Sequence, residues 1–202
     1  MEDYPFLRNE MLWGEEAQRR LARAHVILFG LGGVGSYAAA CLSRSGGGEL
    51  TLHPVCELYD AAHRDRFFPE DCRYDYIADA IDLVSCKLDL AQTALRLNIP
   101  IAAALGTGNK LAPTLLRIAD ISQTFGCLLA RVMRRELRRR GIAHLDVVFS
   151  PEEPAQTVQR EAPPPGRRSV PASNPWVPAA AGLLLGSLIV RRLIAQTEET
   201  IC

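Results

Sequence analysis

A glycine-rich turn between an apolar strand and a helix is the feature that most constrains the fold of this chain. The run His25–Phe29 (HVILF) leads directly into Gly30-Leu31-Gly32-Gly33-Val34-Gly35, which has the spacing G-x-G-x-x-G, and small residues typical of a packed helix follow. Glycines at this spacing let the backbone approach a phosphate, and the start of the helix supplies N–H donors. We predict that Gly30, Gly32, Gly33 and Gly35 bind phosphate. In the alternative, they only let the strand and the helix pack closely.

The order of the other segments predicts an α/β fold. Strand-like runs at 25–29, 49–52, 55–60, 74–82 and 99–106 alternate with helix-like stretches along the first half of the chain. Strands that alternate with helices form parallel sheets covered on both faces. We therefore expect a Rossmann-like, doubly wound and mainly parallel sheet.

The length of 202 residues is compatible with one domain. We divide it into an N-terminal helical arm at 1–24, a nucleotide-binding core at 25–110 and a substrate-side half at 111–202. Residues 151–175 hold seven of the thirteen prolines and have no apolar periodicity, so we expect a mobile loop there.

The formal net charge is zero, so affinity for nucleic acid would have to come from a local patch. A candidate is the basic helix at 128–141, LLARVMRRELRRRG. Its arginines on one face, by i, i+3, i+4, i+7 spacing, are Arg131, Arg134, Arg135 and Arg138. Such a row suits the phosphate backbone of a structured RNA. The alternative is a solvated helix whose cations favour the C-terminal end of the helix dipole.

The cysteines and the apolar segments bear on location. No C-x-x-C pair occurs among the six cysteines, so we expect reduced thiols and no structural zinc. The chain opens with MEDYPF rather than with an apolar signal core, which indicates a cytoplasmic protein. The apolar segment 176–190 has fifteen residues, fewer than the ~20 of a spanning helix, so we expect a buried helix and no membrane span.

The end of the second strand carries no acid for a ribose. An NAD enzyme would place one about 20 residues after the first glycine, where this chain reads Leu50 to His53 and then Pro54. Asp60 could serve only if 55–60 acted as the second strand. An NAD-dependent oxidoreductase therefore has only the glycine turn in its favour.

Longer motifs resemble a known superfamily. They are RNEMLWGEEAQRRLARAHVILFGLGGVGSYAAACLSRSG, YDYIADAID followed by SCKLDL, IPIAAALGTGNKLAPTLLRIADI, and LLARVMRRELRRRG. Together they resemble the ThiF/HesA/MoeB superfamily of ATP-dependent adenylating enzymes. Within it they are most similar to the branch that dehydrates threonylcarbamoyladenosine in transfer RNA to its cyclic form. The resemblance covers most of the chain, and the missing C-x-x-C pairs disfavour the zinc-bearing sulfur-carrier activators.

This resemblance implies roles for particular residues. The four glycines would hold the phosphates of ATP, and Asp82 would hold the magnesium of MgATP and act in catalysis, since a hard carboxylate oxygen suits that ion. Lys87 would contact the nucleotide. Arg8 would reach the triphosphate of a partner subunit in a homodimer, where a cation stabilises the transferring phosphates. The other partner would be the modified transfer RNA. An alternative role for Asp82 is to cap the helix that follows it.

The chain departs from the family pattern after Leu52. Family members carry an acidic D-x-D strand end there, then an N-x-x-R or N-R-Q segment and a lysine on the next helix, and none of these is present. We interpret this as the loss of about one βα unit, of about 30 residues or more. Such a loss would expose apolar faces of the sheet and leave the ATP site incomplete. Asp60, Arg64 or Arg66 could replace the lost groups.

Three functions stay open at this point. The first is an adenylating dehydratase with reduced or absent activity. The second is a non-catalytic remnant or regulatory protein of the same family, and the third is an NAD-dependent oxidoreductase. Cys127 has no evident base in the sequence, where His144 is the nearest histidine, so we expect a buried thiol rather than a nucleophile.

Overall fold

The computed structural model describes residues 6–46, 50–158, 160, 162–163 and 170–195. Over these residues six strands form one sheet in the order β2-β1-β3-β4-β6-β5. The strands are β1 (His25–Phe29), β2 (Thr51–Val55), β3 (Tyr76–Asp79), β4 (Ile101–Ala104), β5 (Arg117–Asp120) and β6 (Asp146–Phe149). Neighbouring strands are parallel except β5 and β6, which are antiparallel. The predicted Rossmann-like, mainly parallel sheet is confirmed.

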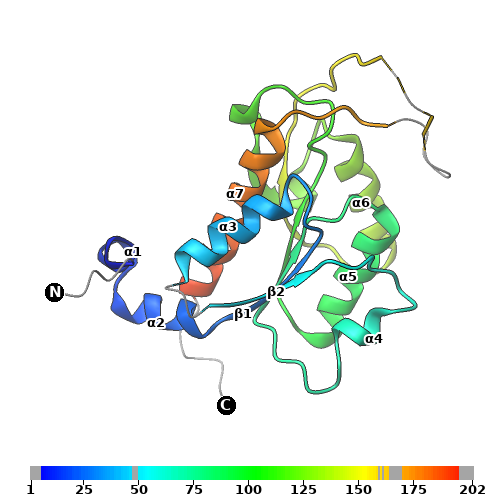
Figure 1. Ribbon diagram of the computed structural model, residues 1–202. Helices are drawn as coiled ribbons and strands as arrows, with labels where there is room; N and C mark the ends of the chain where they lie inside the picture. The colour runs from blue at the N-terminus through cyan, green and yellow to red at the C-terminus, as the bar shows by residue number, and fades with distance from the viewer. Residues whose placement is uncertain (1–5, 47–49, 159, 161, 164–169, 196–202) are drawn as a thin grey trace.

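Helices cover both faces of this sheet (Figure 1). One face carries α3 (Gly35–Ser45) and α7 (Trp176–Ala195), and the other carries α4 (Arg64–Phe67), α5 (Val84–Leu97) and α6 (Leu128–Arg139). The alternation along β1 follows from this arrangement: Val26 and Leu28 join the core beneath α3 and α7, whereas Ile27 and Phe29 join the core beneath α5. The apolar run His25–Phe29 is therefore a strand buried on both faces of the sheet.

The remaining helical segments are short. At the N-terminal end α1 (Leu7–Trp13) and α2 (Glu15–Arg23) are separated by Gly14, whose φ is 87°. The single-turn helices η1 (Pro113–Leu115) and η2 (Ile121–Gln123) flank β5. The predicted loop at 151–175 contains no helix or strand before α7 over its described residues, and 159, 161 and 164–169 lie outside the described part. Its mobility and the three-part division of the chain stay predictions.

Helix α7 is long and apolar enough, by length and composition, to cross a membrane. In this fold it is a core helix, because 56% of its most apolar window is buried. Two glycines bring it close to α3: a Cβ on Gly182 would lie 2.1 Å from the carbonyl oxygen of Val34, and one on Gly186 would lie 2.6 Å from Cβ of Cys41. The expected buried helix is confirmed, and its packing accounts for its composition.

The structure corrects the predicted second strand. We expected a strand to end before His53-Pro54 and a new one to occupy 55–60, but β2 runs through Pro54 to Val55, and 56–60 form no strand. Pro54 lies opposite Leu28 in the register with β1. Since β2 is an edge strand, the N–H that proline lacks is not needed on its open side.

The connection from β2 to β3 contains only the four-residue helix α4. We call its residues 56–75 the aromatic segment, because its rings pack on Phe29 of β1. The ring centroids of Tyr59, Phe67 and Phe68 lie 4.9, 5.6 and 5.7 Å from that of Phe29. The apolar face that we expected to be exposed is therefore covered, by rings instead of by a long helix.

Candidate functional site

The carboxyl ends of β1, β3 and β4 meet at one edge of the sheet, where the glycine turn lies. Two adjoining cavities open there, of about 220 and 540 Å³. The smaller one is lined by Gly32 and Gly33, the larger one by Lys110 and Cys127, and Asp82 lines both. We call these two cavities together the glycine-loop site. Open α/β sheets bind ligands at this edge.

Two of the glycines are required by the packing of the chain on itself. Gly30 has a φ of 87°, and a Cβ there would lie 2.8 Å from the carbonyl oxygen of Ala80. A Cβ on Gly35 would lie 1.7 Å from the carbonyl oxygen of Gly30. Close packing of the strand and the helix is therefore sufficient to explain why glycine occupies positions 30 and 35, as in the alternative interpretation.

The other two glycines face the cavity. A Cβ on Gly32 would meet nothing within 4 Å, and one on Gly33 would approach only the ring of Pro178, at 3.1 Å. Within the described part of the chain, the N–H groups of Gly32 and Gly33 donate no hydrogen bond. They lie just before α3, at its positive end, so they offer donors to an anion. The space beside Gly32 is where a phosphate oxygen would fit.

Asp82 supplies an exposed carboxylate to the same site. It follows β3 in the turn Asp79-Ala80-Ile81-Asp82, which we call the DAID turn. The N-cap position of α5 is held by Leu83, not by Asp82. One carboxylate beside phosphate oxygens and water suits magnesium, which seldom has an all-protein cage. No cluster of three or more His, Cys, Asp or Glu side chains that could hold a metal occurs among the described residues.

Lys87 lies elsewhere than we expected. Its side chain is fully buried, with Nζ 3.1 Å from Oδ1 of Asp79, and it donates a hydrogen bond of 2.8 Å to the carbonyl oxygen of Ala104. Burial raises the pKa of Asp79, and the nearby ammonium opposes that shift. Because both of its contacts are internal, Lys87 is not at the surface of the glycine-loop site. Direct contact with a nucleotide stays a prediction that this geometry does not favour.

The segment Gly106-Thr107-Gly108-Asn109-Lys110 forms the wall opposite the glycine turn. The sequence alone assigns no role to this motif. Asn109, at a φ of 56°, exchanges hydrogen bonds with the backbone of Ala172, and Lys110 donates to the carbonyl oxygen of Glu152. The carboxylate of Glu152 accepts from the N–H groups of Leu111 and Ala112. The sequence signal was the row of glycine and asparagine after β4, which indicates positive φ.

Cys127 is buried, as predicted. Its Sγ accepts a hydrogen bond from the N–H of Ala130 at 3.4 Å, and a Cβ on Gly106 would come within 2.6 Å of this sulfur. The thiol therefore packs between the start of α6 and the wall of the site. The described cysteines are all free thiols.

The residues that could have replaced the lost groups have partners of their own. Arg64 pairs with Asp89, and Asp60 holds His63 at 2.8 Å. Arg66 pairs at 3.1 Å with Glu57, the first acid after β2. These residues belong to the aromatic segment or to the helix beneath it, and none lines the glycine-loop site. The sequence did not indicate Glu57, because the end of β2 was placed too early.

Arg8 lies on α1, remote from the glycine turn of its own chain. The side chain of its neighbour Asn9 donates to the carbonyl oxygen of Arg44 at the C-terminal end of α3, whereas the glycine turn is at the other end of that helix (Figure 1). The geometry within one chain therefore gives Arg8 no role at the site.

The four arginines of α6 differ in their surroundings. Arg131, Arg135 and Arg138 are exposed, and Arg135 pairs with Glu136 at 3.0 Å. Arg134 is half-buried and donates to the carbonyl and hydroxyl oxygens of Thr124, both at 2.6 Å. The exposed part of the predicted row is therefore smaller than the sequence suggested.

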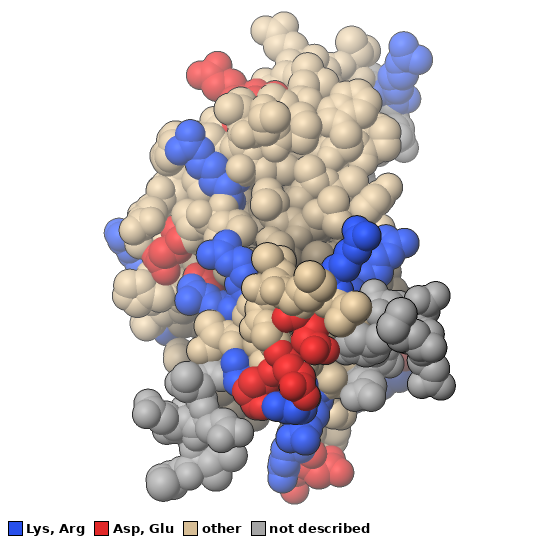
Figure 2. Space-filling view, turned by 90° about the vertical axis from the view of Figure 1, so that its left-hand side faces the viewer, with Lys and Arg blue, Asp and Glu red and all other residues tan. Residues whose placement is uncertain are grey.

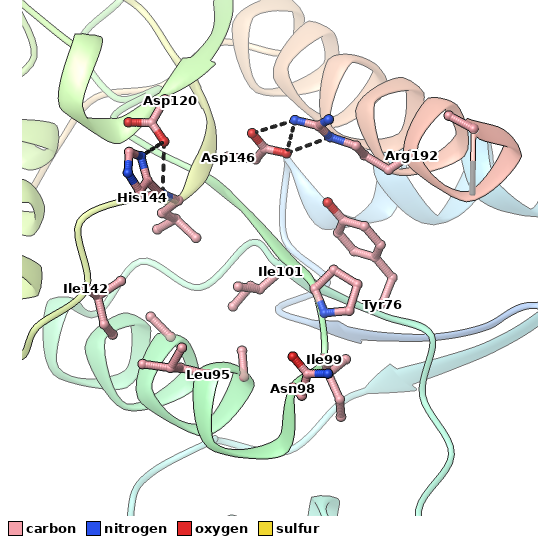
Figure 3. A pocket seen from close by; sticks show the side chains of 15 residues that line it. Tyr76, Leu95, Asn98, Ile99, Ile101, Asp120, Ile142, His144, Asp146 and Arg192 are labelled. Atoms are coloured by element: carbon pink, nitrogen blue, oxygen red, sulfur yellow. Dashed lines mark hydrogen bonds and ion pairs between the residues drawn. The ribbon is translucent and has the colours of Figure 1, made fainter. Parts of the chain in front are cut away.

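A further cavity, of about 650 Å³ and so larger than either cavity of the glycine-loop site, lies at the opposite edge of the sheet, where β3, β4 and β6 begin (Figure 3). Its carboxylates are already engaged: Asp146 accepts two hydrogen bonds from Arg192, at 2.8 and 3.0 Å, and Asp120 holds His144 at 3.3 Å. None of its described lining residues belongs to the first turn of an α-helix. We place the candidate site by its chemistry, and hence at the glycine turn, not by cavity size.

These features define a Rossmann-like α/β domain with a glycine-rich turn and a cavity at the carboxyl edge of its sheet. The model of the ThiF family matches residues 6–53. The chain is 31% identical to the tRNA threonylcarbamoyladenosine dehydratase of Bacillus subtilis, with 96% of each covered, and 30% identical to that of Escherichia coli, with 70% of this chain and 71% of the relative covered. It belongs to the tRNA threonylcarbamoyladenosine dehydratase family.

The solved structures support the same fold. The chain matches the Escherichia coli tRNA N6-threonylcarbamoyladenosine dehydratase in complex with ATP with a TM-score of 0.78, at 24% identity, over 94% of this chain and 93% of that one. The alignment with the Bacillus subtilis relative spans 247 positions, 45 more than the 202 residues of this chain. Relatives therefore have residues without a counterpart here. The short β2–β3 connection is where a doubly wound fold would hold another helix.

Proposed function

We propose that this chain is an ATP-dependent tRNA threonylcarbamoyladenosine dehydratase of the cytoplasm whose nucleotide site is reduced on its ribose side. The observation that carries the proposal is the meeting of the Gly32 and Gly33 N–H groups with the Asp82 carboxylate in one cavity at the start of α3. The N–H groups would hold phosphate oxygens, and Asp82 would hold a magnesium ion bound to them.

The reaction needs two steps. The carboxylate of the threonyl group attacks the α-phosphorus of ATP, which forms an acyl adenylate and releases pyrophosphate. A nucleophile within the modification then attacks the acyl carbon, closes the ring and releases AMP. The protein's task is to hold the triphosphate and the carboxylate in line.

A homodimer would give Arg8 its role. Helix α1 presents Leu7, Met11 and Leu12, which are 53%, 79% and 79% exposed, on a segment that also carries Arg8. Figure 2 views this side of the molecule: charged side chains gather in its lower part, and its upper part is largely uncharged. The exposed apolar side chains of α1 favour contact with a second copy, whose triphosphate Arg8 would then approach.

The exposed arginines Arg131, Arg135 and Arg138, with Arg134 behind them, are the candidate contact for transfer RNA. Neutralising Arg131 and Arg138 together should weaken affinity for transfer RNA and lower its salt dependence by about one phosphate contact per arginine. Replacing Arg134 should instead loosen the Thr124 turn, because that side chain is committed to it.

A specific observation favours a second function, that of a nucleotide-binding protein without turnover. Within the described part of the chain, Arg64 and Arg66, the two cations that could have replaced the lost groups, are paired with Asp89 and Glu57 instead of being open to a polyphosphate. Such a protein would bind MgATP and form no adenylate.

The test is to incubate the purified chain with MgATP and transfer RNA that carries threonylcarbamoyladenosine. AMP release with loss of one water from the modified nucleoside, detected by mass spectrometry and absent in Asp82→Asn, is the expected result. MgATP binding without AMP release would establish the second function. Binding of NAD in place of ATP would contradict both.

A further inference from the structure

The glycine-loop site rests on a buried ion pair that has no contact with either cavity. The side chains of Lys87 and Asp79 are 0% and 1% exposed, and 3.1 Å separates Nζ from Oδ1. Burying two charges costs free energy that their attraction repays only partly, so a pair like this is a weak source of stability. Its position is more informative than its strength, because it lies directly behind the DAID turn.

Asp79 fixes the backbone of that turn from one side. Its Oδ1 also accepts a hydrogen bond of 3.0 Å from the N–H of Ile81. The next residue is Asp82, so the carboxylate that faces the cavity is one peptide unit from this tether. The other side of the turn is closed by the glycine loop, since a Cβ on Gly30 would lie only 2.8 Å from the carbonyl oxygen of Ala80.

Lys87 connects the same turn to the opposite wall. Its second hydrogen bond, of 2.8 Å, goes to the carbonyl oxygen of Ala104, the last residue of β4. Gly106 and Thr107 follow within three residues and line both cavities together with Asp82. One ammonium group therefore holds together the turn that carries Asp82 and the strand that leads into the far wall.

We propose that the Asp79–Lys87 pair is a positioning device that fixes the Asp82 carboxylate at its distance from the glycine loop. Lys87 then acts on a bound nucleotide only through Asp82, which accounts for its burial. This inference rests on the proposed function, because it gives Asp82 the task of holding magnesium on the phosphates of ATP. Small displacements of such a group have large effects on a metal held between two partners.

Two measurements on Lys87→Met test the proposal. In the nucleotide-free protein, native-state hydrogen exchange of the Ile81 amide should be faster by about tenfold or more, because the turn loses its support. In calorimetric titrations, the gain in ATP affinity that Mg²⁺ gives the wild-type protein should be lost, whereas affinity for ATP without Mg²⁺ should stay within about twofold.

The matched control is Arg64→Met. Arg64 is the partner of Asp89, which lies on α5 two residues after Lys87. This substitution should lower stability but leave the Ile81 exchange rate and the Mg²⁺ effect at wild-type values. If Lys87→Met fails to fold, the double variant Asp79→Asn/Lys87→Met replaces it, since neutral replacement of a buried pair often preserves stability. The double variant should lose the Mg²⁺ effect as well.

The two ideas fail in different ways. Wild-type protein that binds ATP equally well with and without Mg²⁺ overturns the role of Asp82 in the proposed function. A folded Lys87→Met or double variant that keeps the wild-type Mg²⁺ effect overturns the positioning role. An unchanged Ile81 exchange rate in Lys87→Met overturns it too, whatever the nucleotide does.

Discussion

The two sides of the sheet's carboxyl edge are built in opposite ways. At β1, β3 and β4 the backbone leaves an open space beside Gly32 and an exposed carboxylate at Asp82, and among the described residues the N–H groups of Gly32 and Gly33 donate no hydrogen bond. Beside β2, Arg64 neutralises a carboxylate of α5, and aromatic rings fill the face of the sheet. The first side has backbone N–H groups that face a cavity, whereas the second side uses its polar side chains for contacts within the fold.

This difference indicates that the geometry of the glycine-loop site does not depend on a long connection after β2. Its donors are backbone N–H groups positioned by β1 and α3, and these need nothing from β2 beyond its pairing with β1. Contacts to a ribose or a polyphosphate that are made by side chains after β2 are not positioned by β1 and α3, so they depend on the residues of the β2–β3 connection. Substitutions on the two sides should therefore differ in their effects on the free energy of unfolding and on nucleotide binding.

Gly35→Ala should have the largest effect. The added Cβ would lie 1.7 Å from the carbonyl oxygen of Gly30, which is backbone and cannot rotate away. We expect a loss of about 4 kcal/mol or more in the free energy of unfolding, measured by urea titration, together with loss of nucleotide binding. A variant within about 1 kcal/mol of wild type would show that α3 does not close against the loop as described.

Phe68→Ala tests the other side. Phe68 is 7% exposed and its ring stacks on Phe29, so its removal should cost about 3 kcal/mol and leave the affinity for MgATP unchanged. The matched control is Phe125→Ala, since Phe125 is 54% exposed, and it should cost far less. If Phe68→Ala also weakened MgATP binding tenfold, the aromatic segment would belong to the nucleotide site after all.

Arg64→Met should cost about 2 kcal/mol near pH 7, because it leaves a half-buried carboxylate without its charged partner. Burial would raise the pKa of Asp89, but hydrogen bonds from Arg64 and Tyr59 outweigh it and hold that pKa below its usual value. The pair therefore stabilises the fold above the unfolded pKa, and this contribution is lost as the pH falls through the folded pKa. Urea titrations should show the gap between variant and wild type shrinking below about pH 4. A gap that is independent of pH would contradict the ion pair.

Gly32→Ala should have the smallest effect on stability. A Cβ there meets nothing within 4 Å, so the free energy of unfolding should stay within about 0.5 kcal/mol of wild type. The same methyl group would occupy the space of a phosphate oxygen, and affinity for MgATP should fall by about tenfold, or about 1.4 kcal/mol. Unchanged affinity would mean that the phosphate does not lie against Gly32.

The parts that the sequence could predict are those in which local pattern and neighbouring contacts agree. The run HVILF predicted a strand buried on both faces, the spacing of the glycines predicted the turn after it, and the apolar segment from Trp176 predicted a buried helix. The DAID turn was identified through the resemblance, and the structure brings it to the same edge as the glycines.

The parts that it could not predict depend on contacts between distant residues. A proline such as Pro54 is compatible with an edge strand but not with a central one. That β2 lies at an edge follows only from the order of the whole sheet. The burial of Lys87 depends on how α5 docks on β3 and β4. The aromatic segment has no periodicity of its own, because Tyr59, Phe67 and Phe68 are positioned by their contacts with Phe29 of β1.

Calorimetric titrations that compare how tightly the protein binds MgATP and magnesium tripolyphosphate would test most directly whether the phosphate side of the site is intact while the ribose side is not. If the phosphate side is intact and the ribose side is not, both ligands should bind with affinities within about tenfold of each other, since the nucleoside would add at most about 1.4 kcal/mol. MgATP binding that is 100-fold or more tighter than that of tripolyphosphate, about 2.7 kcal/mol, would contradict the account, because it would require a ribose or adenine site beside β2.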